Sequence, residues 1–305
     1  MKPAVPMLGN PARATRTLGA ILIDSGQLTS EDAERVLQYQ KQHKLRFGEA
    51  AVRLGLMSEA DIQFALSRQF AYAYLRKVPG DSRSISDELV AAYQPFSARV
   101  EQLRAIRSQL MLRWFDRAEE RQVLTILGAE RGEGRTYLAA NLAVVFSQLG
   151  ERTLLVDADM RTPRQHFLFS LENRIGFSTM LAGRLREEAV VRIPDLPGLS
   201  VLPSGPTPPN PLELLNRLNL EEFMIGVKGM YDVVIVDTPA MSIGEDAAMI
   251  AVKTGAALAV ARSGATRVAA FTDMVQGLMD AGVAIVGSVL NEVPLKKLKK
   301  PKKAK

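Results

Sequence analysis

The 305-residue sequence contains no cysteine and only two histidines, His43 and His166. Without cysteine the chain has no disulfides, no thiolate metal sites and no cysteine nucleophiles. Two histidines far apart in the chain do not favour a histidine-based metal site. No run approaches the roughly 18–20 consecutive apolar residues that a membrane-spanning helix needs. The opening "MKPAVPMLGNPARATRT" also lacks the apolar centre of a secretory signal. We therefore expect a cytoplasmic protein.

Charge of one sign is concentrated at the carboxyl terminus. The chain carries a formal net charge of +6, and seven lysines without any acid lie in residues 296–305, "KKLKKPKKAK". The remainder is nearly neutral, so basicity is a property of this tail and not of a folded surface. The tail is either a solvated segment or a segment attracted to an anionic membrane surface. Nucleic-acid binding would depend on the tail alone and is not favoured.

The amino-terminal part contains a repeat with a spacing of 29 residues, because "LGAILIDSGQLTSED" at 18–32 aligns with "FGEAAVRLGLMSEAD" at 47–61. Each copy predicts a short helix, a turn at a glycine, a helix cap at Thr29 or Ser58, and a second helix. Neither copy buries its apolar face alone, so we expect the two to pack into one small helical domain.

Short apolar runs alternate with helical patterns from Val123 onward. The runs are "VLTIL", "TLLVD", "LSVLP", "DVVIVD", "ALAVA" and "AIVGSVL". They are rich in β-branched residues, as strands buried on both faces tend to be. This predicts an α/β fold with a mainly parallel sheet flanked by helices. The expected parts are a flexible 1–14, a helical domain 15–76, a linker 77–86, the α/β domain 87–295 and the tail 296–305.

The segment "GAERGEGRT" at 128–136 lies between a strand pattern and a helix pattern. The glycines at 132 and 134 do not begin a dinucleotide fingerprint, because Tyr137 stands at the third glycine position. The segment fits a P-loop, in which backbone N–H groups and a helix N-terminus surround phosphates. Thr136 would then supply a hydroxyl to magnesium, and Arg135 a positive charge.

Acidic residues end two further strand patterns. "LLVDADMR" contributes Asp157 and Asp159, and "VVIVDTP" contributes Asp237. Each alone fits a turn or cap, but three strand-end acids beside a glycine-rich loop suit magnesium, which prefers oxygen ligands. The sequence therefore predicts a nucleotide site with magnesium beside the glycine-rich loop.

The second domain resembles the bacterial tyrosine kinases that accompany polysaccharide chain-length proteins, which are relatives of the deviant-Walker ATPases. Five segments in order carry the resemblance: "EQLRAIR", "RGEGRT", "LLVDADMR", "LPSGPTPPNPLELL" and "VVIVDTP". It implies Mg-ATP-dependent phosphoryl transfer in exopolysaccharide synthesis, with a membrane chain-length (co-polymerase) protein as partner at the inner membrane.

The resemblance also implies roles for individual residues. Asp157 and Asp159 would be catalytic together with Arg135, and ATP would bind with Mg²⁺ held at Thr136, Asp157 and Asp237. Self-association through one helix face would use Glu101, Arg104 and Arg107, so the resemblance implies a homo-oligomer. Arg161 would approach either the phosphates or a neighbouring subunit, or would be a surface residue. The nucleotide would contact Gly132, Glu133, Gly134, Arg135, Thr136, Tyr137 and, near the base, Asn291 in "GSVLN".

Two departures from the family leave an alternative open. Arg135 replaces the usual phosphate-binding lysine, and a planar guanidinium is not equivalent to an ammonium at a tight site. The tail has lysines where these kinases carry a tyrosine cluster, since the last tyrosine is Tyr231. The alternative is an ATP-hydrolysing assembly switch of the same fold that phosphorylates no tyrosine.

The amino-terminal repeat resembles the small helical domain at the start of type II secretion and pilus ATPases. Some members of that group bind cyclic di-GMP through a tandem motif that begins with Arg-Leu-Gly. Here "RFG" at 46–48 keeps the arginine, whereas "TLG" at 17–19 lacks it. The domain is therefore either a docking module or a cyclic di-GMP site with half of the expected arginines.

Overall fold

The computed structural model of the chain divides into two compact units, Met1–Arg76 and Lys77–Lys305. The residues that it describes are 17–59, 61–62, 65–66, 74–75, 85–117, 122–183, 187–216 and 219–292. The segment 1–14, most of the linker 77–86 and the lysine tail 296–305 lie outside the described residues. Each unit is described by itself.

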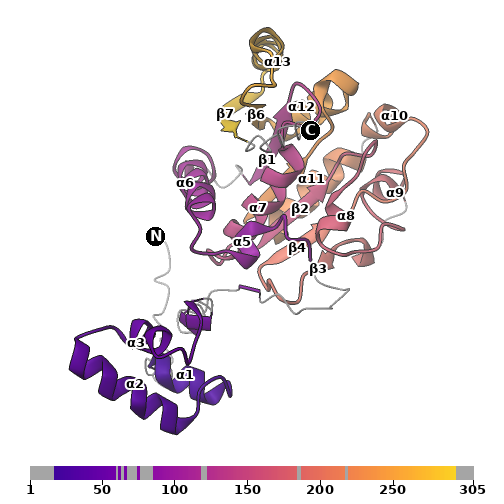
Figure 1. The fold of residues 1–305 in the computed structure, drawn as a ribbon. Coiled ribbons are helices and arrows are strands. Elements are labelled where there is room, and N and C mark those ends of the chain that lie inside the picture. The colour runs from indigo at the N-terminus through magenta and orange to yellow at the C-terminus, as the bar shows by residue number, and fades with distance from the viewer. Residues whose placement is uncertain are drawn as a thin grey trace, which may run out of the picture. The chain divides into compact units, whose positions relative to one another are not determined.

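The amino-terminal unit contains the helices α1 (Leu18–Asp24), α2 (Ser30–His43) and α3 (Phe47–Arg53) (Figure 1). Thr29 Oγ1 caps α2 by accepting a hydrogen bond of 3.1 Å from Asp32 N–H. Ser58 Oγ accepts the equivalent bond from Asp61 N–H at 3.2 Å. The turn glycines before the two caps have nearly equal φ angles of 69° and 68°. The repeat in the sequence is thus a repeat in backbone conformation.

Residues from both repeats fill one core in this unit. Leu22 and Val36 from the first repeat are fully buried, as are Ala50 and Ala51 from the second. Gly48 is needed because a Cβ there would collide with the Ile62 side chain. Neither repeat has enough apolar surface for a core of its own, so the two fold together.

The second unit contains one seven-stranded sheet in the order β3-β4-β2-β5-β1-β6-β7. All neighbouring strands are parallel except β3, which pairs antiparallel with β4. The α/β fold with a mainly parallel sheet is therefore confirmed, and the short antiparallel edge strand was not predicted. The strands are β1 (Val123–Gly128), β2 (Thr153–Asp157), β3 (Val191–Arg192), β4 (Leu199–Leu202), β5 (Val233–Asp237), β6 (Ala256–Arg262) and β7 (Ala284–Asn291).

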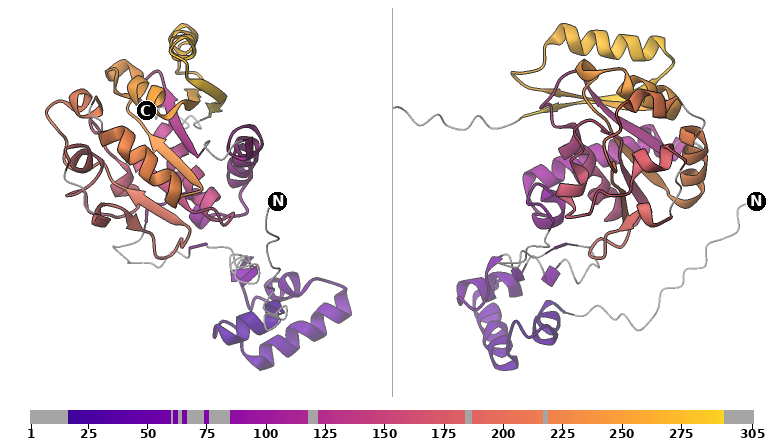
Figure 2. Two further views of the ribbon diagram at one scale, coloured as in Figure 1. Left: turned by 180° about the vertical axis from the view of Figure 1, so that it is seen from behind. Right: turned by 90° about the vertical axis from the view of Figure 1, so that its right-hand side faces the viewer.

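Helices cover both faces of the sheet (Figures 1 and 2). On one face α7 packs on β1, β2 and β5, with α5 and α6 against α7. On the other face apolar side chains of α9 to α13 pack on the strands. The remaining helices are α5 (Val90–Tyr93), α6 (Ala98–Arg113), η1 (Phe115–Arg117), α7 (Arg135–Ser147), α8 (Gln165–Leu168), α9 (Phe177–Leu181), η2 (Glu187–Ala189), α10 (Pro211–Leu215), α11 (Asn219–Met230), η3 (Met241–Ile243), α12 (Asp246–Thr254) and α13 (Val268–Asp280).

The helical segment before β1 is divided into α5 and α6. The break falls at "QPFS", where Pro95 disfavours a helical conformation at Gln94. Ser97 then caps α6 by accepting a hydrogen bond from Val100 N–H. α6 is thereby free to run in its own direction beside α7, and it contributes to the site described below.

Helix α7 is the most deeply buried helix near the site, because it lies between the sheet and the helices α5 and α6. Eleven of its 13 residues are buried. Its Asn141 side chain accepts a bond from Ala91 N–H at 3.0 Å and donates to Glu88 O at 2.9 Å. These bonds fix the α5 segment on α7. Among the described helices none is long and apolar enough to cross a bilayer.

Candidate active site

The glycine-rich loop connects the end of β1 at Gly128 to the start of α7 at Arg135. Gly132 and Gly134 have φ angles of 79° and 94°, in the region that side-chain-bearing residues rarely adopt. These two glycines let the chain wrap around the N-terminus of α7. The free N–H groups of a helix N-terminus attract anions, so the loop has the geometry of a phosphate-binding loop.

Asp157 and Asp237 end the adjacent strands β2 and β5 and are direct partners in the parallel ladder. Both side chains are fully buried. Side chains alternate between the faces of a sheet, and Leu154, Val156, Val234 and Val236 face the helices α9 to α12. The two carboxyl groups therefore lie on the opposite face, where α7 begins.

Three backbone N–H groups surround the carboxyl group of Asp157. The donors are Asp159 at 3.3 Å, Arg164 at 3.1 Å and Gln165 at 2.9 Å. Burial raises the pKa of Asp157 well above its usual range, and the neighbouring Asp237 raises it further. The backbone bonds oppose this rise, because they favour the charged form.

Asp237 has one bonded and one free carboxyl oxygen. Its Oδ2 accepts a hydrogen bond of 2.8 Å from Gln165 Nε2, whereas Oδ1 is buried and has no partner among the described residues. Burial raises the pKa of Asp237 to about 6, against the opposing effect of the Gln165 hydrogen bond and of the nearby Thr136 hydroxyl. A buried oxygen without a donor is costly in a stable protein, so this atom is suited to a ligand.

Asp159 follows the end of β2 by two residues and is the one of the three predicted acids that lines the cavity beside the loop, although only 6% of its surface is exposed. It is held by bonds from Arg161 N–H at 3.1 Å and from Thr162 N–H and Oγ1–H at 2.8 and 2.9 Å. The Arg161 side chain instead pairs with the buried Asp246. Arg161 is therefore neither a free surface residue nor a lining residue of the cavity.

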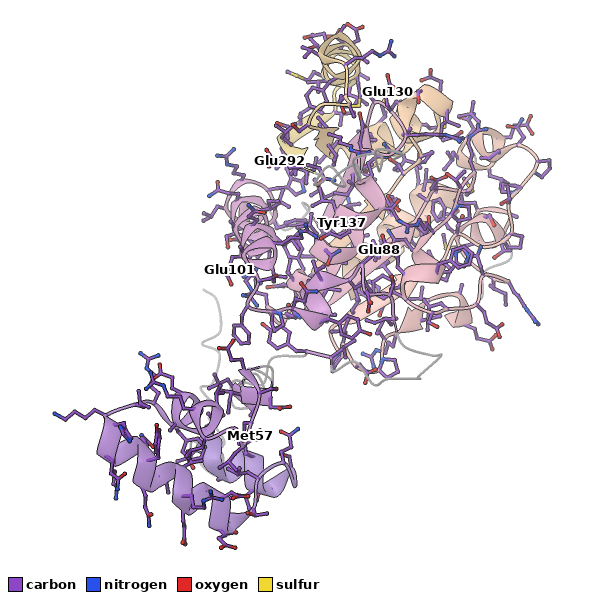
Figure 3. All side chains as sticks on the ribbon, viewed as in Figure 1. Met57, Glu88, Glu101, Glu130, Tyr137 and Glu292 are labelled. Carbon is purple, nitrogen blue, oxygen red and sulfur yellow. The ribbon has the colours of Figure 1, made fainter. Side chains whose placement is uncertain are left out.

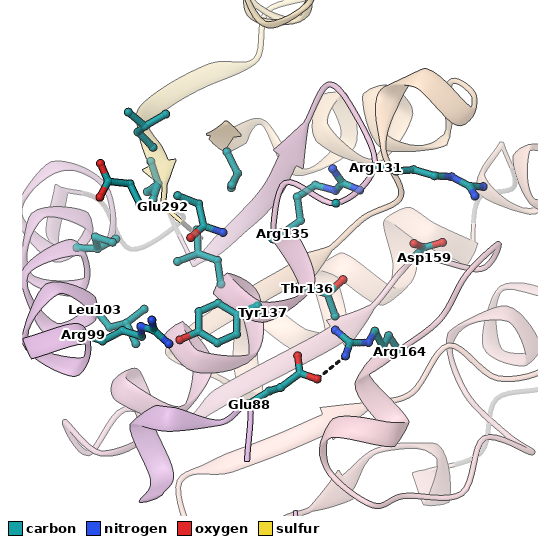
Figure 4. Close-up of a pocket in the computed structure, with 18 of the residues that line it drawn as sticks. Glu88, Arg99, Leu103, Arg131, Arg135, Thr136, Tyr137, Asp159, Arg164 and Glu292 are labelled. Atoms are coloured by element: carbon teal, nitrogen blue, oxygen red, sulfur yellow. Dashed lines mark hydrogen bonds and ion pairs between the residues drawn. The ribbon is translucent and has the colours of Figure 1, made fainter. Parts of the chain in front are cut away.

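The cavity has a volume of about 960 Å³, which is in the range of ligand sites. Helix α6, the glycine-rich loop and the end of β7 surround it (Figure 4). Of the predicted residues it is lined by Gly132, Gly134, Arg135, Thr136, Tyr137, Asp159 and Asn291. The predicted metal-binding acids Asp157 and Asp237 do not line the cavity, and Asp237 lies close to the Thr136 side chain.

The Tyr137 side chain points from α7 towards α6, where it meets Arg99 (Figure 4). Burial raises the pKa of the Tyr137 phenol, and Arg99 opposes this rise. On the other side of the cavity, Arg164 forms an ion pair with Glu88. Glu88, Arg99 and Arg164 all line the cavity, and none was among the residues that we predicted.

Arg135 folds back onto the loop. Its Nη1 donates to Glu130 O at 2.6 Å and approaches Glu133 Oε2 at 3.4 Å, while Nε donates to Thr238 O at 3.3 Å. Burial lowers the pKa of Arg135, although Asp237 and Glu133 oppose this. Arg135 is buried, with 8% of its surface exposed, and it forms part of the cavity wall. The guanidinium thus links the loop to the strand β5 segment.

Asn291 ends β7 and lies against the loop. Its Nδ2 donates to Glu133 O at 3.0 Å. A Cβ at Gly134 would collide with this amide, so Gly134 is required for close approach as well as for its φ angle. Asn291 also lines the cavity.

The motif of Glu101, Arg104 and Arg107 lies on α6. Glu101 is on the side of α6 away from the sheet and forms an ion pair with Arg104 (Figure 3). Arg107 points towards α7, where Nη1 donates to Val145 O at 2.8 Å. Glu101 and Arg104 thus form an ion pair with each other at the surface, whereas Arg107 binds the backbone of α7.

The contribution of α6 to the cavity was not predicted from the sequence. Four of its residues, Arg99, Gln102, Leu103 and Ile106, line the cavity. Their spacing of three, four and seven residues marks one helix face, so the pattern was present. The spacing alone did not predict a cavity wall, because the sequence does not show that α6 lies beside the glycine-rich loop.

The predicted magnesium ligands fit an ion that is shared with a nucleotide. Within the described residues, no group of three or more His, Asp or Glu side chains forms a metal site. Asp157, Asp237 and Thr136 supply two carboxyl groups and one hydroxyl. Magnesium is typically held by one or two carboxylates together with substrate phosphates and water, and the free Oδ1 of Asp237 suits this arrangement.

The family model described as "Cellulose biosynthesis protein BcsQ" matches residues 121–273. The tyrosine-protein kinase YwqD of Bacillus subtilis (strain 168) is 35% identical over 209 residues, which cover 68% of this chain and 87% of YwqD. The tyrosine-protein kinase Etk of Escherichia coli (strain K12) is 36% identical over 204 residues. That alignment covers 67% of this chain but only 28% of Etk.

A solved structure gives the same result. The kinase domain of Escherichia coli tyrosine kinase Etk superposes with a TM-score of 0.66 and 33% identity. The match covers 73% of this chain and 86% of the kinase domain. The described P-loop unit therefore shares both its fold and a substantial part of its sequence with kinase domains.

Proposed function

The chain belongs to the bacterial tyrosine-protein kinases, and we propose that its second unit binds Mg-ATP and transfers the γ-phosphoryl group to a tyrosine hydroxyl of a protein. One observation carries this proposal. A glycine-rich loop at a buried helix N-terminus, two neighbouring strand-end aspartates and the Thr136 hydroxyl meet at the edge of a 960 Å³ cavity.

The loop residues would hold the phosphates. The N–H groups at the start of α7 and in the loop bind anions, and the dipole of the 13-residue helix adds to this attraction. Apolar side chains of α6 and β7, including Leu103 and Val289, line the rest of the cavity and suit the base of a nucleotide. Asn291 offers a side-chain amide on the same side.

Thr136, Asp157 and Asp237 would hold the magnesium ion. Magnesium, when bound, neutralises negative charge on the phosphates. Asp237 has a buried oxygen ready to accept a ligand, and hydrogen bonds from Gln165 and from the backbone around Asp157 fix the two carboxyl groups. The protein thereby orients both groups before any ligand arrives.

Asp159 would receive the proton of the acceptor. It is the strand-end acid that lines the cavity, and Arg161 N–H and the Thr162 groups hold its carboxylate in place. In the transfer, the acceptor oxygen forms a bond to the γ-phosphorus while the bond to the β,γ-bridging oxygen breaks, and the phenolic proton passes to Asp159. ADP leaves with the electrons of the broken bond.

A second candidate function is an ATP-hydrolysing assembly switch that phosphorylates no tyrosine. The observation that favours it is Arg135, whose guanidinium is bound to the carbonyls of Glu130 and Thr238. Residues 232–305 also contain no tyrosine that could act as an acceptor. In this case water takes the place of the acceptor hydroxyl.

Incubation with γ-labelled ATP and magnesium, followed by phosphoamino-acid analysis, separates the two candidates. Phosphotyrosine on this chain or on an added tyrosine polymer identifies the kinase. Release of labelled phosphate without phosphotyrosine identifies the switch. A Thr136→Ala variant serves as the control, because it keeps the fold and removes one magnesium-binding group. Activity equal to that of the unmodified protein in this variant would contradict both candidates.

For the cellular setting, we propose that the protein acts in the synthesis or export of a polysaccharide with a membrane chain-length protein. The matching family model is described by a role in cellulose biosynthesis, which supports this assignment. The protein would work as a homo-oligomer in the cytoplasm, at the inner surface of the membrane. The lysine tail at 296–305 lies outside the described residues and would provide attraction to that surface.

For the amino-terminal unit we propose a docking role, with cyclic di-GMP binding as the alternative. Arg46 and Thr17 occupy the same N-cap position in the two repeats, and Arg46 is exposed. Only one of the two positions therefore offers a guanidinium to guanine or phosphate. Calorimetric titration with cyclic di-GMP decides between the two, and heat that disappears in an Arg46→Ala variant would favour the ligand site.

A further inference from the structure

Glu133 is a buried carboxylate at the centre of the phosphate loop, with 1% of its surface exposed. Burying such a group is costly unless it is well hydrogen-bonded. Its Oε2 accepts a bond of 3.0 Å from Glu130 N–H and lies 3.4 Å from Arg135 Nη1. Its Oε1 accepts a bond of 2.6 Å from Thr266 Oγ1, which is 133 residues away.

The Thr266 hydroxyl donates this bond because a carboxylate accepts hydrogen bonds, and a second contact is consistent with that direction. Thr266 Oγ1 itself accepts a bond of 2.8 Å from Arg262 N–H. A hydroxyl has a single proton, so that proton is left for Glu133. A hydroxyl-to-carboxylate bond of this length belongs to the stronger class of hydrogen bonds.

The same segment, residues 262–267 between β6 and α13, contacts the loop at two more places. Arg262 Nη1 donates to Gly132 O at 3.3 Å. Arg267 donates to Glu130 Oε1 through Nε at 2.9 Å and Nη2 at 2.5 Å. Glu130 lies beside the start of α13 in Figure 3. Three loop residues are thus held from one segment.

The segment is itself well ordered by backbone bonds. Ala265 and Thr266 N–H donate to Arg262 O at 3.1 and 3.0 Å. Ser263 N–H donates to Asn291 O at 3.0 Å, which attaches the segment to the end of β7. A glycine-rich loop has many accessible conformations of its own, so these contacts from a rigid neighbour restrict it.

We propose that residues 262–267 form a brace that holds the phosphate loop open for a nucleoside triphosphate, with Thr266 as a positioning residue that acts through Glu133. The inference rests on the proposed nucleotide binding. The brace fixes Glu133, and Glu133 in turn contacts the Arg135 guanidinium and the Glu130 amide. A loop that is arranged before binding loses less conformational entropy when the phosphates arrive.

The test compares Thr266→Val with Thr266→Ser in the full-length protein. Valine keeps the shape and removes the hydroxyl, whereas serine keeps the hydroxyl. We expect Thr266→Val to weaken binding of fluorescent Mg-ATP by about tenfold, the value for one hydrogen bond to a charged group, and Thr266→Ser to restore most of it. Equal losses in both variants would mean that Thr266 serves packing only and would overturn the proposal.

Thr254→Val is the matched control, because Thr254 Oγ1 makes a bond of 2.7 Å to Thr125 Oγ1 at the opposite end of β6. This variant should keep the nucleotide affinity unchanged. Arg267→Ala is a second test that is safe for folding, since 77% of its side chain is exposed. It should weaken nucleotide binding by about threefold, because a single exposed ion pair contributes little.

Hydrogen exchange of the loop amides 130–136 without nucleotide separates this inference from the proposed function. Thr266→Val should speed exchange there by about tenfold, and Thr254→Val should not. If the unmodified protein binds no nucleotide, the proposed function fails, and the exchange result still decides whether the brace orders the loop. Unchanged exchange together with unchanged affinity in Thr266→Val would overturn the brace.

Discussion

Asp157 and Asp237 are direct neighbours across the parallel pair of β2 and β5, and both carboxyl groups are fully buried on the side where α7 begins. Two neighbouring buried carboxyl groups repel each other when both are charged. A cation or a proton relieves this repulsion, so the pair is arranged for a ligand that brings positive charge.

The pH dependence of this pair follows from the raised pKa of Asp237, which is about 6 against an ordinary value of 3.8. The folded, ligand-free protein binds the proton more tightly than the unfolded chain does. The stabilisation from this group is therefore complete below about pH 4 and is lost as the pH rises through about 6. Magnesium needs the charged form, so Mg-ADP affinity should rise over the same range, by up to about tenfold per pH unit.

Thermal unfolding between pH 4 and 8, with and without Mg-ADP, measures both effects. An Asp237→Asn variant does not titrate at this position. It should therefore lack both the stability change and the change in Mg-ADP affinity that Asp237 causes. If the variant keeps the same pH dependence of Mg-ADP affinity, another group is responsible.

Asp159→Asn should lower turnover more than nucleotide binding, because Asp159 faces the cavity whereas Asp157 and Asp237 lie behind it. We expect a loss in kcat of about a hundredfold, the usual size for a missing general base. Asp157→Asn should instead lower both kcat and the magnesium affinity. A stopped assay over a range of magnesium concentrations distinguishes the two patterns, and full turnover in Asp159→Asn would remove its assigned role.

Arg135→Lys should lower activity by several-fold. The guanidinium reaches Glu130 O through Nη1 and Thr238 O through Nε, and one ammonium nitrogen cannot replace both. The loss of one such bond is about 1 kcal/mol. Steady-state ATP hydrolysis and the melting temperature are the two measurements. Higher activity in the lysine variant would show that the arginine is a poorer form of the usual residue and not an adapted one.

Substitutions in the α6 motif should have two different effects, one for Glu101 and Arg104 and another for Arg107. The double variant Glu101→Ala, Arg104→Ala removes a surface ion pair and should shift sedimentation towards monomer without changing the melting temperature. Arg107→Ala should lower stability by about 1 kcal/mol, because its bond to Val145 O is lost. An unchanged sedimentation profile in the double variant would assign Glu101 and Arg104 to the helix surface alone.

Deletion of residues 296–305 should weaken binding to acidic vesicles. Each of the seven lysines contributes about 1 kcal/mol of attraction to an anionic surface, and salt screens this attraction. Liposome flotation at low and high salt is the measurement, with neutral vesicles as the control. Equal flotation of the truncated and full-length proteins would rule out the tail as a membrane anchor.

Local sequence patterns predicted much of the candidate site. Apolar runs that end in Asp157, Asp237 and Asn291 predict parallel strands, and the carboxyl ends of such strands meet at one edge of a sheet. The glycine-rich loop before a helix predicts the phosphate site, since such a site depends on glycines and a helix N-terminus. The amino-terminal repeat likewise predicts its two caps, because a helix cap is a contact within three residues.

Only the tertiary structure decided which side chains share the site. Arg99 on α6 faces the cavity because Pro95 breaks the helical stretch and α6 packs on α7, a contact between segments that the sequence does not pair. Glu133 and Thr266 are 133 residues apart, and only the folded sheet brings them within 2.6 Å. Local sequence sets the preferences of each segment, but which polar groups meet in a buried place depends on packing over the whole sheet.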